Sequence, residues 1–204
     1  MNQALLIFVK NLVSGKVKTR LAVTIGNDGA MLVYKQLIQH TVSITQDLPF
    51  EKIVYYSDTI ENQDLWNNQI YQKQVQSGND LGQRMQQAFA FAFRKGNQKL
   101  VIIGTDCLEI NSTHIINSFH WLKTHDVVIG PARDGGYYLL AMKQMHVQLF
   151  ENIQWSTEHV LKQTLTVCRA LNLTVHLLPE LSDIDSEEDL KKTKVPYQPQ
   201  VPES

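Results

Sequence analysis

Two short runs of consecutive apolar residues are the clearest feature of the hydrophobic pattern. Residues 4–9 read ALLIFV and residues 100–103 read LVII. Neither run alternates with polar residues, so both predict strands that are buried on both faces, as in parallel sheets. Further strands are predicted at residues 53–57, 71–76, 127–129, 137–142 and 174–178. The strand at residues 71–76 is expected nearer an edge of the sheet, because its apolar and polar residues alternate only weakly.

Segments with helical spacing of apolar residues separate these strands. Residues 28–48 carry one apolar stripe, with Asp28 as the expected N-cap and Pro49 as the stop. A strongly amphipathic helix is predicted after Asp80 and is closed by Lys95-Gly96. The remaining predicted helices cover residues 60–66, 111 or 112 to 125, 156–171, and a short stretch from Ser186.

The alternation of strands and helices predicts an α/β fold with a mainly parallel sheet and helices on both faces. The chain has 204 residues, enough for a core that needs no disulfide or structural metal. We expect one domain over residues 1–192. Residues 193–204 contain three prolines and are expected to form a loose tail.

Composition narrows the class of protein. The formal net charge of −1 gives no general attraction to nucleic acid or to anionic membranes. The two cysteines, Cys107 and Cys168, form no CxxC pair and have no histidine at zinc-ligand spacing, which predicts a reducing compartment and no zinc site. No apolar run has the length of a signal segment or a membrane span, so a cytoplasmic protein is expected.

A cationic segment follows the first predicted strand. Residues 10–21 read KNLVSGKVKTRL, and residues 1–27 contain no acidic residue. A glycine lets backbone approach a ligand closely, and lysine and arginine neutralise phosphate oxygens. The spacing matches neither a Walker A loop nor a GxGxxG fingerprint. A solvated basic loop is the alternative, but the place after the first strand favours phosphate binding.

Acidic residues follow two of the predicted strands. Asp106 comes just after the strand at 100–103, where it could hold a divalent metal or a substrate hydroxyl, or simply cap the turn. Asp183 and Asp185 flank Ile184 in an extended segment, so their carboxylates point the same way. Ser186 and Asp189 have the spacing of a capping box, which explains part of this acidic stretch without a ligand.

Three loops have both a functional and a structural interpretation. Residues 76–85, QSGNDLGQRM, could offer backbone N–H groups to a nucleotide, but a turn with Asp80 as N-cap is the simpler explanation. Residues 130–137 could bring backbone close to a ligand or form an ordinary hairpin loop. Ser156 or Thr157 could cap a helix or face a substrate.

Taken together, these motifs resemble a known family. The pattern is FVK…GKVKTRL, then QxGxDLGxRM, GTDC, GPAxDGGYY, WST and DxDSxEDL, over roughly residues 4–191. It resembles the small bacterial family of GT-A-type glycosyltransferases labelled radical-SAM/selenodomain-associated transferases. It is more distantly similar to the guanylyltransferases that act on 2-phospholactate and on molybdopterin.

The resemblance implies a nucleotide-diphospho-sugar transferase fold that uses Mg²⁺ or Mn²⁺, a nucleoside triphosphate or nucleotide-sugar, and a small acceptor. Lys18 and Arg20 would stabilise developing charge beside Asp106. The other implied roles are phosphate or nucleotide binding by Lys10, Gly15, Lys16, Thr19, Gly78, Asp80 and Gly82, an acceptor side at Asp134, Gly135, Gly136 and Tyr137, and metal ligation by Asp106 with Asp183 or Asp185.

Three hypotheses remain open at this stage. Nucleotidyl transfer fits the cationic segment and the single carboxylate in Asp106-Cys107-Leu108, where glycosyltransferases of this fold usually carry Asp-x-Asp. Glycosyl transfer fits the label of the family. A nucleotide-binding module without turnover is the third. The sequence departs from the family pattern at Leu108, at residues 12–14 and at Lys10, but the other motif residues are intact.

Overall fold

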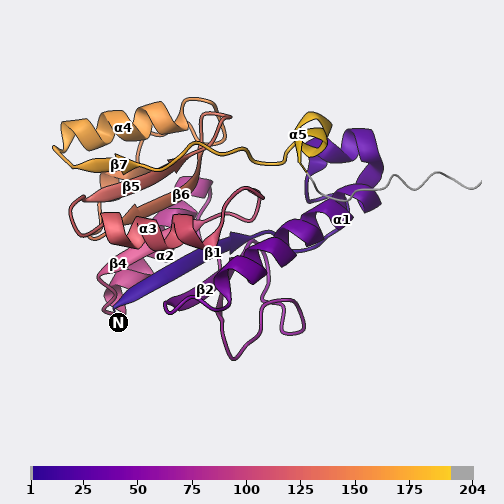
Figure 1. Cartoon of the computed structure of the whole chain (residues 1–204), viewed down its shortest axis with the longest axis horizontal. Helices are drawn as coiled ribbons and strands as arrows, with labels where there is room; N and C mark the ends of the chain where they lie inside the picture. Colours follow the sequence, from indigo (N-terminus) through magenta and orange to yellow (C-terminus); the bar gives the residue numbers. More distant parts are fainter. Residues whose placement is uncertain (1, 194–204) are drawn as a thin grey trace, which may run out of the picture.

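The computed structural model describes residues 2–193, which form seven strands and five α-helices around one sheet (Figure 1). The predicted loose tail, apart from Thr193, lies outside the described residues. The strands are β1 Gln3–Val9, β2 Glu51–Tyr56, β3 Gln72–Val75, β4 Lys99–Ile103, β5 Val127–Pro131, β6 Tyr137–Met142 and β7 Val175–Leu177. The helices are α1 Thr19–Thr45, α2 Leu81–Arg94, α3 Ser112–Trp121, α4 Val160–Ala170 and α5 Glu187–Lys192, with a 3-10 turn, η1, at Val147–Phe150.

The strand order is β3-β2-β1-β4-β6-β5-β7. β1 pairs in parallel with β2 and β4, and β2 pairs in parallel with β3. β6 runs antiparallel to both β4 and β5, while β5 and β7 are parallel. The prediction of a mainly parallel α/β sheet is therefore confirmed, with β6 as the reversed strand.

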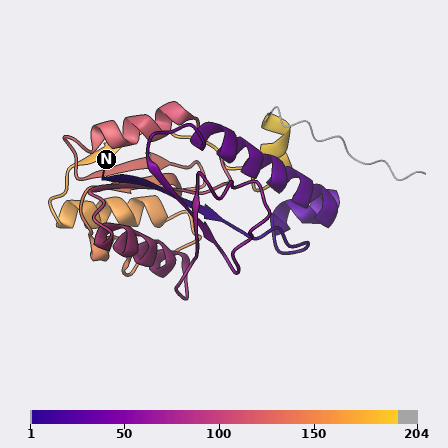
Figure 2. The same ribbon diagram turned by 90° about the horizontal axis from the view of Figure 1, so that it is seen from below.

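Helices cover both faces of the sheet, as the sequence predicted (Figure 2). The residues of β1 and β4 are almost wholly buried, which explains their unbroken apolar runs. One core contains Leu37 of α1 and Phe119 of α3, and the other contains Phe89 of α2 and Cys168 of α4. Strands β1, β2, β4, β5 and β6 contribute residues to both cores, so the sheet is the shared middle layer.

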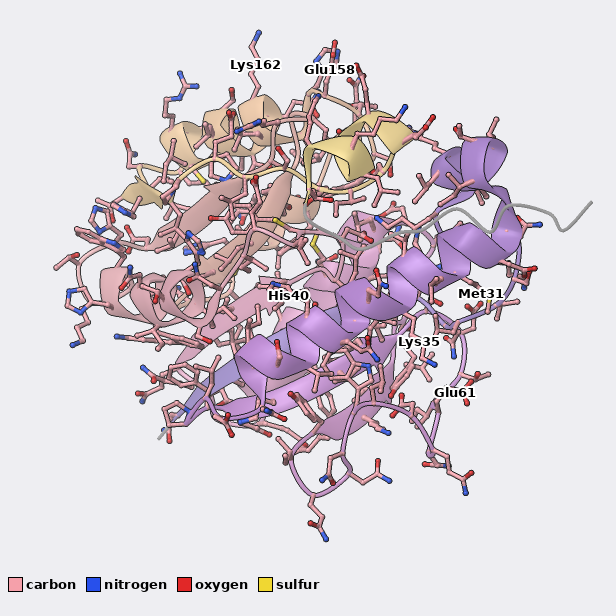
Figure 3. The ribbon with its side chains drawn as sticks, turned by 45° about the vertical axis from the view of Figure 1, so that its right-hand side comes forward. Met31, Lys35, His40, Glu61, Glu158 and Lys162 are labelled. Carbon is pink, nitrogen blue, oxygen red and sulfur yellow. The ribbon has the colours of Figure 1, made fainter. Side chains whose placement is uncertain are left out.

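Helix α1 begins earlier than predicted. It starts at Thr19 and not at Asp28, and it is interrupted at Gly26, where φ 77° and ψ 165° are outside the helical range. Asp28 is therefore not the N-cap of this helix, and the cationic segment is partly helical. Figure 3 shows Met31, Lys35 and His40 in succession along the part of α1 after the kink. His40 anchors this part through a 2.8 Å hydrogen bond between Nε2 and the carbonyl of Ile110.

Two predicted helices were partly or wholly wrong. Residues 60–66 form no helix and bend at residues 62–66, where Asp64 is held by Lys73 Nζ at 2.8 Å and Trp66 is buried against Tyr71. The helix predicted from Ser156 begins at Val160 and has no side-chain cap. Ser156 has φ 63°, and Thr157 Oγ1 instead donates to the carbonyl of Gln154.

The other caps agree with the sequence. Asp80 accepts from Gln83 N at the start of α2, Asn111 caps α3, and Ser186 forms a capping box with Asp189 at the start of α5. Helix α3 ends at Trp121, four residues before its predicted end. Among residues 2–193, no helix combines the length and the hydrophobicity that a bilayer span requires.

Candidate functional site

A cavity of about 810 Å³ opens beyond the carboxyl ends of β1, β2, β3 and β4. The antiparallel strand β6 begins at the same edge, so its first residue also lines the cavity. Ligands of open α/β sheets bind at this kind of edge, where loops leave the strands.

Lys18 lies at the centre of the charged groups in this cavity. It is the N-cap of α1 in a left-handed conformation with φ 47°, and its side chain is 4% exposed. Its Nζ lies 2.6 Å from Asp106 Oδ1 and 2.8 Å from Asp185 Oδ1. Burial lowers the pKa of Lys18, but the charges and hydrogen bonds of the two carboxylates outweigh burial, so the pKa lies above its ordinary value. Lys18 therefore remains cationic and joins the segment after β1 to two distant acidic segments.

Asp183 is the most unusual carboxyl group of the site. Burial, together with the charges of Asp106 and Asp134 and against the opposing charge of Lys18, raises its pKa to about 7. Its buried Oδ1 has no hydrogen-bond partner among the described residues. The segment is fixed beside the strand end by a 2.9 Å hydrogen bond from Ile184 N to the carbonyl of Asp106. A buried oxygen without a partner calls for a ligand, because burial of an unsatisfied polar group is costly.

Asp106, Asp183 and Asp185, which we call the acidic cluster, offer carboxylate oxygens that suit a hard divalent cation. Among residues 2–193, no three side chains of His, Cys, Asp or Glu are grouped closely enough to form a complete metal site. Mg²⁺ commonly takes only one or two protein carboxylates and completes its shell with water and substrate phosphates. Lys18 holds one oxygen of Asp106 and one of Asp185, which leaves their second oxygens and Asp183 Oδ1 as ligands that fit such a site.

Most of the predicted binding residues in the cationic segment line the cavity, but Gly15 does not. Lys10, Lys16, Thr19 and Arg20 line the cavity together with Lys18. Gly15 does not line it, and its φ of 76° indicates that it turns the loop. The segment therefore brings four cationic side chains to the cavity, from Lys10, Lys16, Lys18 and Arg20, and we call this part of the lining the cationic wall.

Tyr34 is a cavity residue that the sequence did not single out. It lies on the apolar stripe of α1 and is almost fully buried, but its hydroxyl accepts from Lys10 N at 2.8 Å and lies 2.9 Å from Thr105 Oγ1. It thereby links the ends of β1 and β4. Helical periodicity identifies Tyr34 as a core residue and carries no signal for this polar contact.

Three residues predicted to bind the nucleotide lie outside the cavity lining. Gly78, Asp80 and Gly82 do not line it. Asp80 caps α2, and Gly82 lies against Trp155, where a Cβ would be only 2.1 Å from the indole Nε1. The cavity is lined instead by neighbours of these residues, namely Gln76, Leu81, Arg84 and Met85.

The predicted acceptor side does reach the cavity. Asp134, Gly136 and Tyr137 line it, and Asp134 Oδ1 accepts a 2.9 Å hydrogen bond from Gly136 N. Gly135 does not line it but has φ 87° and lies against the backbone of Glu158. Trp155 and Ser156 complete this wall. The loop before α4 thus contributes more to the cavity than its expected role as a helix cap.

A comparison with protein families finds a match over residues 40–157 to the family described as "Uncharacterized protein conserved in bacteria (DUF2064)". This range includes Asp106 and Asp134 but neither the cationic segment nor Asp183. A comparison with curated proteins finds no match.

Solved structures extend the similarity over most of the chain. A candidate nucleotide-diphospho-sugar transferase from Desulfovibrio desulfuricans G20 is 30% identical with a TM-score of 0.87, over 93% of this chain and 84% of that one. A cytidylyltransferase from Leptospira borgpetersenii serovar Hardjo-bovis has a TM-score of 0.55 at 16% identity, over 93% and 84%. Rv0371C of Mycobacterium tuberculosis H37Rv, in complex with manganese, has a TM-score of 0.55 at 10% identity, over 93% and 96%. These likenesses confirm the predicted nucleotide-diphospho-sugar transferase fold.

Proposed function

The chain belongs to the bacterial family DUF2064, and from this premise we propose that it is a metal-dependent transferase acting on a nucleotide-activated substrate. The donor is a nucleotide-sugar or a nucleoside triphosphate, and the acceptor is a small molecule. The single observation that carries this proposal is the meeting of Lys18 with Asp106 and Asp185 in one large cavity at the strand ends.

The cationic wall is suited to a diphosphate. Lys10, Lys16 and Arg20 present positive charge to the cavity beside Lys18, and the N-terminal turn of α1 adds free backbone N–H groups. Phosphate oxygens accept such hydrogen bonds, and a preorganised cluster of donors stabilises the charge that grows on a departing diphosphate. Lys18 is already held in place by two carboxylates, so little reorganisation is needed when the donor binds.

The acidic cluster is suited to the metal that this reaction requires. Asp106, Asp183 and Asp185 are the residues that would hold Mg²⁺ or Mn²⁺. The bound ion would supply charge that neutralises phosphate oxygens and orients the diphosphate. The manganese complex of Rv0371C and the cytidylyltransferase of similar fold support this proposal as analogies from neighbours of low identity.

Binding is tested by thermal unfolding with the four nucleoside triphosphates, UDP- and GDP-sugars and the free diphosphates, each with and without Mg²⁺ or Mn²⁺. A ligand at a hundred times its Kd stabilises the native state by about 2.7 kcal/mol. For a chain of this size that raises the midpoint by about 5–10 °C. A metal-dependent shift with one class of nucleotide supports the proposal and identifies the donor.

Turnover is tested with Asp106→Asn. We expect the rate to fall by about a hundredfold or more, because the substitution removes negative charge from the proposed metal site. The matched control is Asp47→Asn, an exposed aspartate beyond the end of α1, which should retain wild-type turnover. Metal-dependent turnover that survives Asp106→Asn would refute the role of Asp106. Nucleotide binding that needs no metal and is not followed by turnover would favour a binding module instead.

A further inference from the structure

Most cations of the cavity come from one segment of the chain, and two of its carboxylates lie on a separate part of its lining. Lys10, Lys16, Lys18 and Arg20 all come from the segment after β1. A second part of the lining, formed by Asp134, Tyr137, Trp155, Ser156 and Glu158, contributes two carboxylates and, among the described residues, no cation; we call it the acidic wall. The remaining cation of the cavity, Arg84, is held at the β3–α2 turn, where its Nε donates to the carbonyl of Gly78.

Hydrogen bonds and ion pairs connect the charged residues of the cavity. Lys18 contacts Asp106 and Asp185 directly. The segment that carries Asp183 contacts both regions: Ile184 N donates to the carbonyl of Asp106 at 2.9 Å, and Arg133 N, next to Asp134, donates to the carbonyl of Leu181 at 3.0 Å. Gly135, next to Asp134, accepts a 2.9 Å hydrogen bond from Leu161 N and lies against Glu158. Acidic residues therefore extend from the strand end at Asp106 to the loops that carry Asp134 and Glu158.

The acidic wall is built into the fold and is not a chance grouping of surface residues. Trp155 lies against Gly82 so closely that any Cβ there would overlap its indole, and Tyr137 meets its ring edge-on at a centroid distance of 6.4 Å. Glu158 lies just before α4, near Lys162 (Figure 3). Lys162 lines a groove on another side of α4 and not the cavity, so it does not supply a cation to this wall.

This wall has the chemistry of a site for neutral hydroxyl compounds. Carboxylates accept hydrogen bonds from hydroxyl groups, and an indole offers an apolar surface to the C–H groups of a sugar ring. An anionic acceptor would meet two like charges and no cationic partner, which is how a site rejects a ligand.

We infer that the acceptor is an uncharged polyhydroxyl compound whose hydroxyl group, and not a phosphate or carboxylate, attacks the donor. This inference rests on the proposed transferase function and specifies its second substrate. The hydroxyl oxygen forms the new bond to the transferred group, and the bond from that group to the diphosphate breaks. The electron pair leaves with the diphosphate on the cationic side, and the hydroxyl proton passes to a carboxylate of the acidic wall.

The test compares glucose with glucose 6-phosphate as probes that differ by one phosphate. The full-length protein is first saturated with the nucleoside diphosphate and Mg²⁺ that stabilise it, and each probe is then titrated by calorimetry. We expect glucose to bind at least about tenfold more tightly than glucose 6-phosphate. The Glu158→Lys variant should shift this ratio toward the phosphate ester by about tenfold or more.

The matched control is Glu151→Lys, the same charge reversal at an exposed residue outside the cavity, which should leave the ratio unchanged. Tighter binding of glucose 6-phosphate than of glucose by the wild-type protein would overturn the inference, as would an unchanged ratio in Glu158→Lys. Either result leaves the proposed function intact as long as the nucleotide binds. Failure of every nucleotide to bind would instead refute the proposed function in the first step.

Discussion

At the scale of single residues, Lys18 combines three properties that seldom coincide in one lysine. It has a left-handed backbone, a buried side chain, and two carboxylate partners that are themselves 39% and 45% exposed. The exposed partners keep their second oxygens accessible to a ligand, whereas Lys18 has no comparable access to solvent. We therefore regard Lys18 as the fixed charge of the site and the carboxylates as its adjustable part.

Lys18→Met should weaken nucleotide binding by about tenfold to a hundredfold, because a charge-assisted hydrogen bond contributes about 1.5–3 kcal/mol. Isothermal titration of the nucleotide identified above measures this effect. Lys35→Met, an exposed change on the middle of α1 (Figure 3), is the control and should leave the Kd within about twofold. Unchanged affinity in Lys18→Met would contradict the assignment of Lys18 to the phosphate site.

At the scale of elements, the β5–β6 hairpin and the loop before α4 depend on a backbone contact. Gly135 has φ 87°, and a Cβ there would lie 2.2 Å from the carbonyl oxygen of Glu158. Because the obstructing atom belongs to the backbone, no side-chain rotation can relieve the overlap. The position of the acidic wall is thus set by this glycine.

Gly135→Ala should lower the free energy of unfolding by about 2–4 kcal/mol, through backbone strain and overlap together. Gly96→Ala provides the matched control, since Gly96 has φ 93° but nothing within 4 Å of its expected Cβ. It should cost only about 1 kcal/mol, from strain alone. Urea denaturation of both variants measures the difference, and equal losses would show that the contact with Glu158 is not important.

A second element-scale contact ties the edge strand β7 to the sheet. Asp126 accepts from Thr174 N at 2.8 Å and from Thr174 Oγ1 at 2.6 Å, and it pairs with Lys143 Nζ at 3.0 Å. The hydrogen bonds from Thr174 and the charge of Lys143 lower the pKa of Asp126 to about 2. The carboxylate therefore links residues that precede β5 and β7 to the residue that follows β6.

Because the folded pKa of Asp126 is below its unfolded value, this stabilisation is present above about pH 4 and is lost as pH falls toward about 2. Asp126→Asn should lower the free energy of unfolding by about 1–2 kcal/mol at pH 7. The difference from wild type should shrink as the pH falls from 4 to 2, as followed by urea denaturation at each pH. A difference independent of pH over this range would show that the charge does not matter.

At the scale of the whole molecule, the two cores lie on opposite faces of the sheet and share its strands. Each core buries one cysteine, Cys107 in the core that contains α1 and Cys168 in the core that contains α4. Burial raises the pKa of Cys107 to about 12 and that of Cys168 to about 11. The native thiols are thus both shielded and protonated, which makes them poor nucleophiles.

In the native protein, neither thiol should react with an aromatic disulfide reagent at pH 8 except through unfolding, and in urea both should react. Since the two cores share the sheet, both thiols should react at the same rate under native conditions. The Cys168→Ala variant assigns the remaining signal to Cys107. Faster labelling of Cys107 would show that the cavity edge opens independently of the rest of the molecule.

Much of this architecture was predictable because it depends on local pattern. The apolar runs of β1 and β4 signal burial on both faces, and Asp80, Asn111 and Ser186 signal helix starts. What could not be predicted depends on contacts between distant residues. The loop at residues 60–66 is not helical because Lys73 and Tyr71 hold Asp64 and Trp66.

The candidate site shows the same division. Motif residues such as Lys18, Asp106 and Asp183 were identified from their positions after strands, and the structure places them together. The assignment of metal and acceptor roles to them stays a prediction. Tyr34 entered the site only through tertiary contacts with Lys10 and Thr105, and no periodicity reveals these.

The hydrogen bond between Lys18 and Asp185 joins residues 167 positions apart, with consequences for how the protein is made. A ribosome adds about 5–20 residues per second, so the cationic segment emerges roughly 10–30 seconds before its carboxylate partner. Throughout this interval the nascent chain cannot assemble the pocket, and no nucleotide can assist its folding. The newly made chain can therefore bind its ligand only after residue 185 has emerged, and termination before that residue yields a fragment without the complete site.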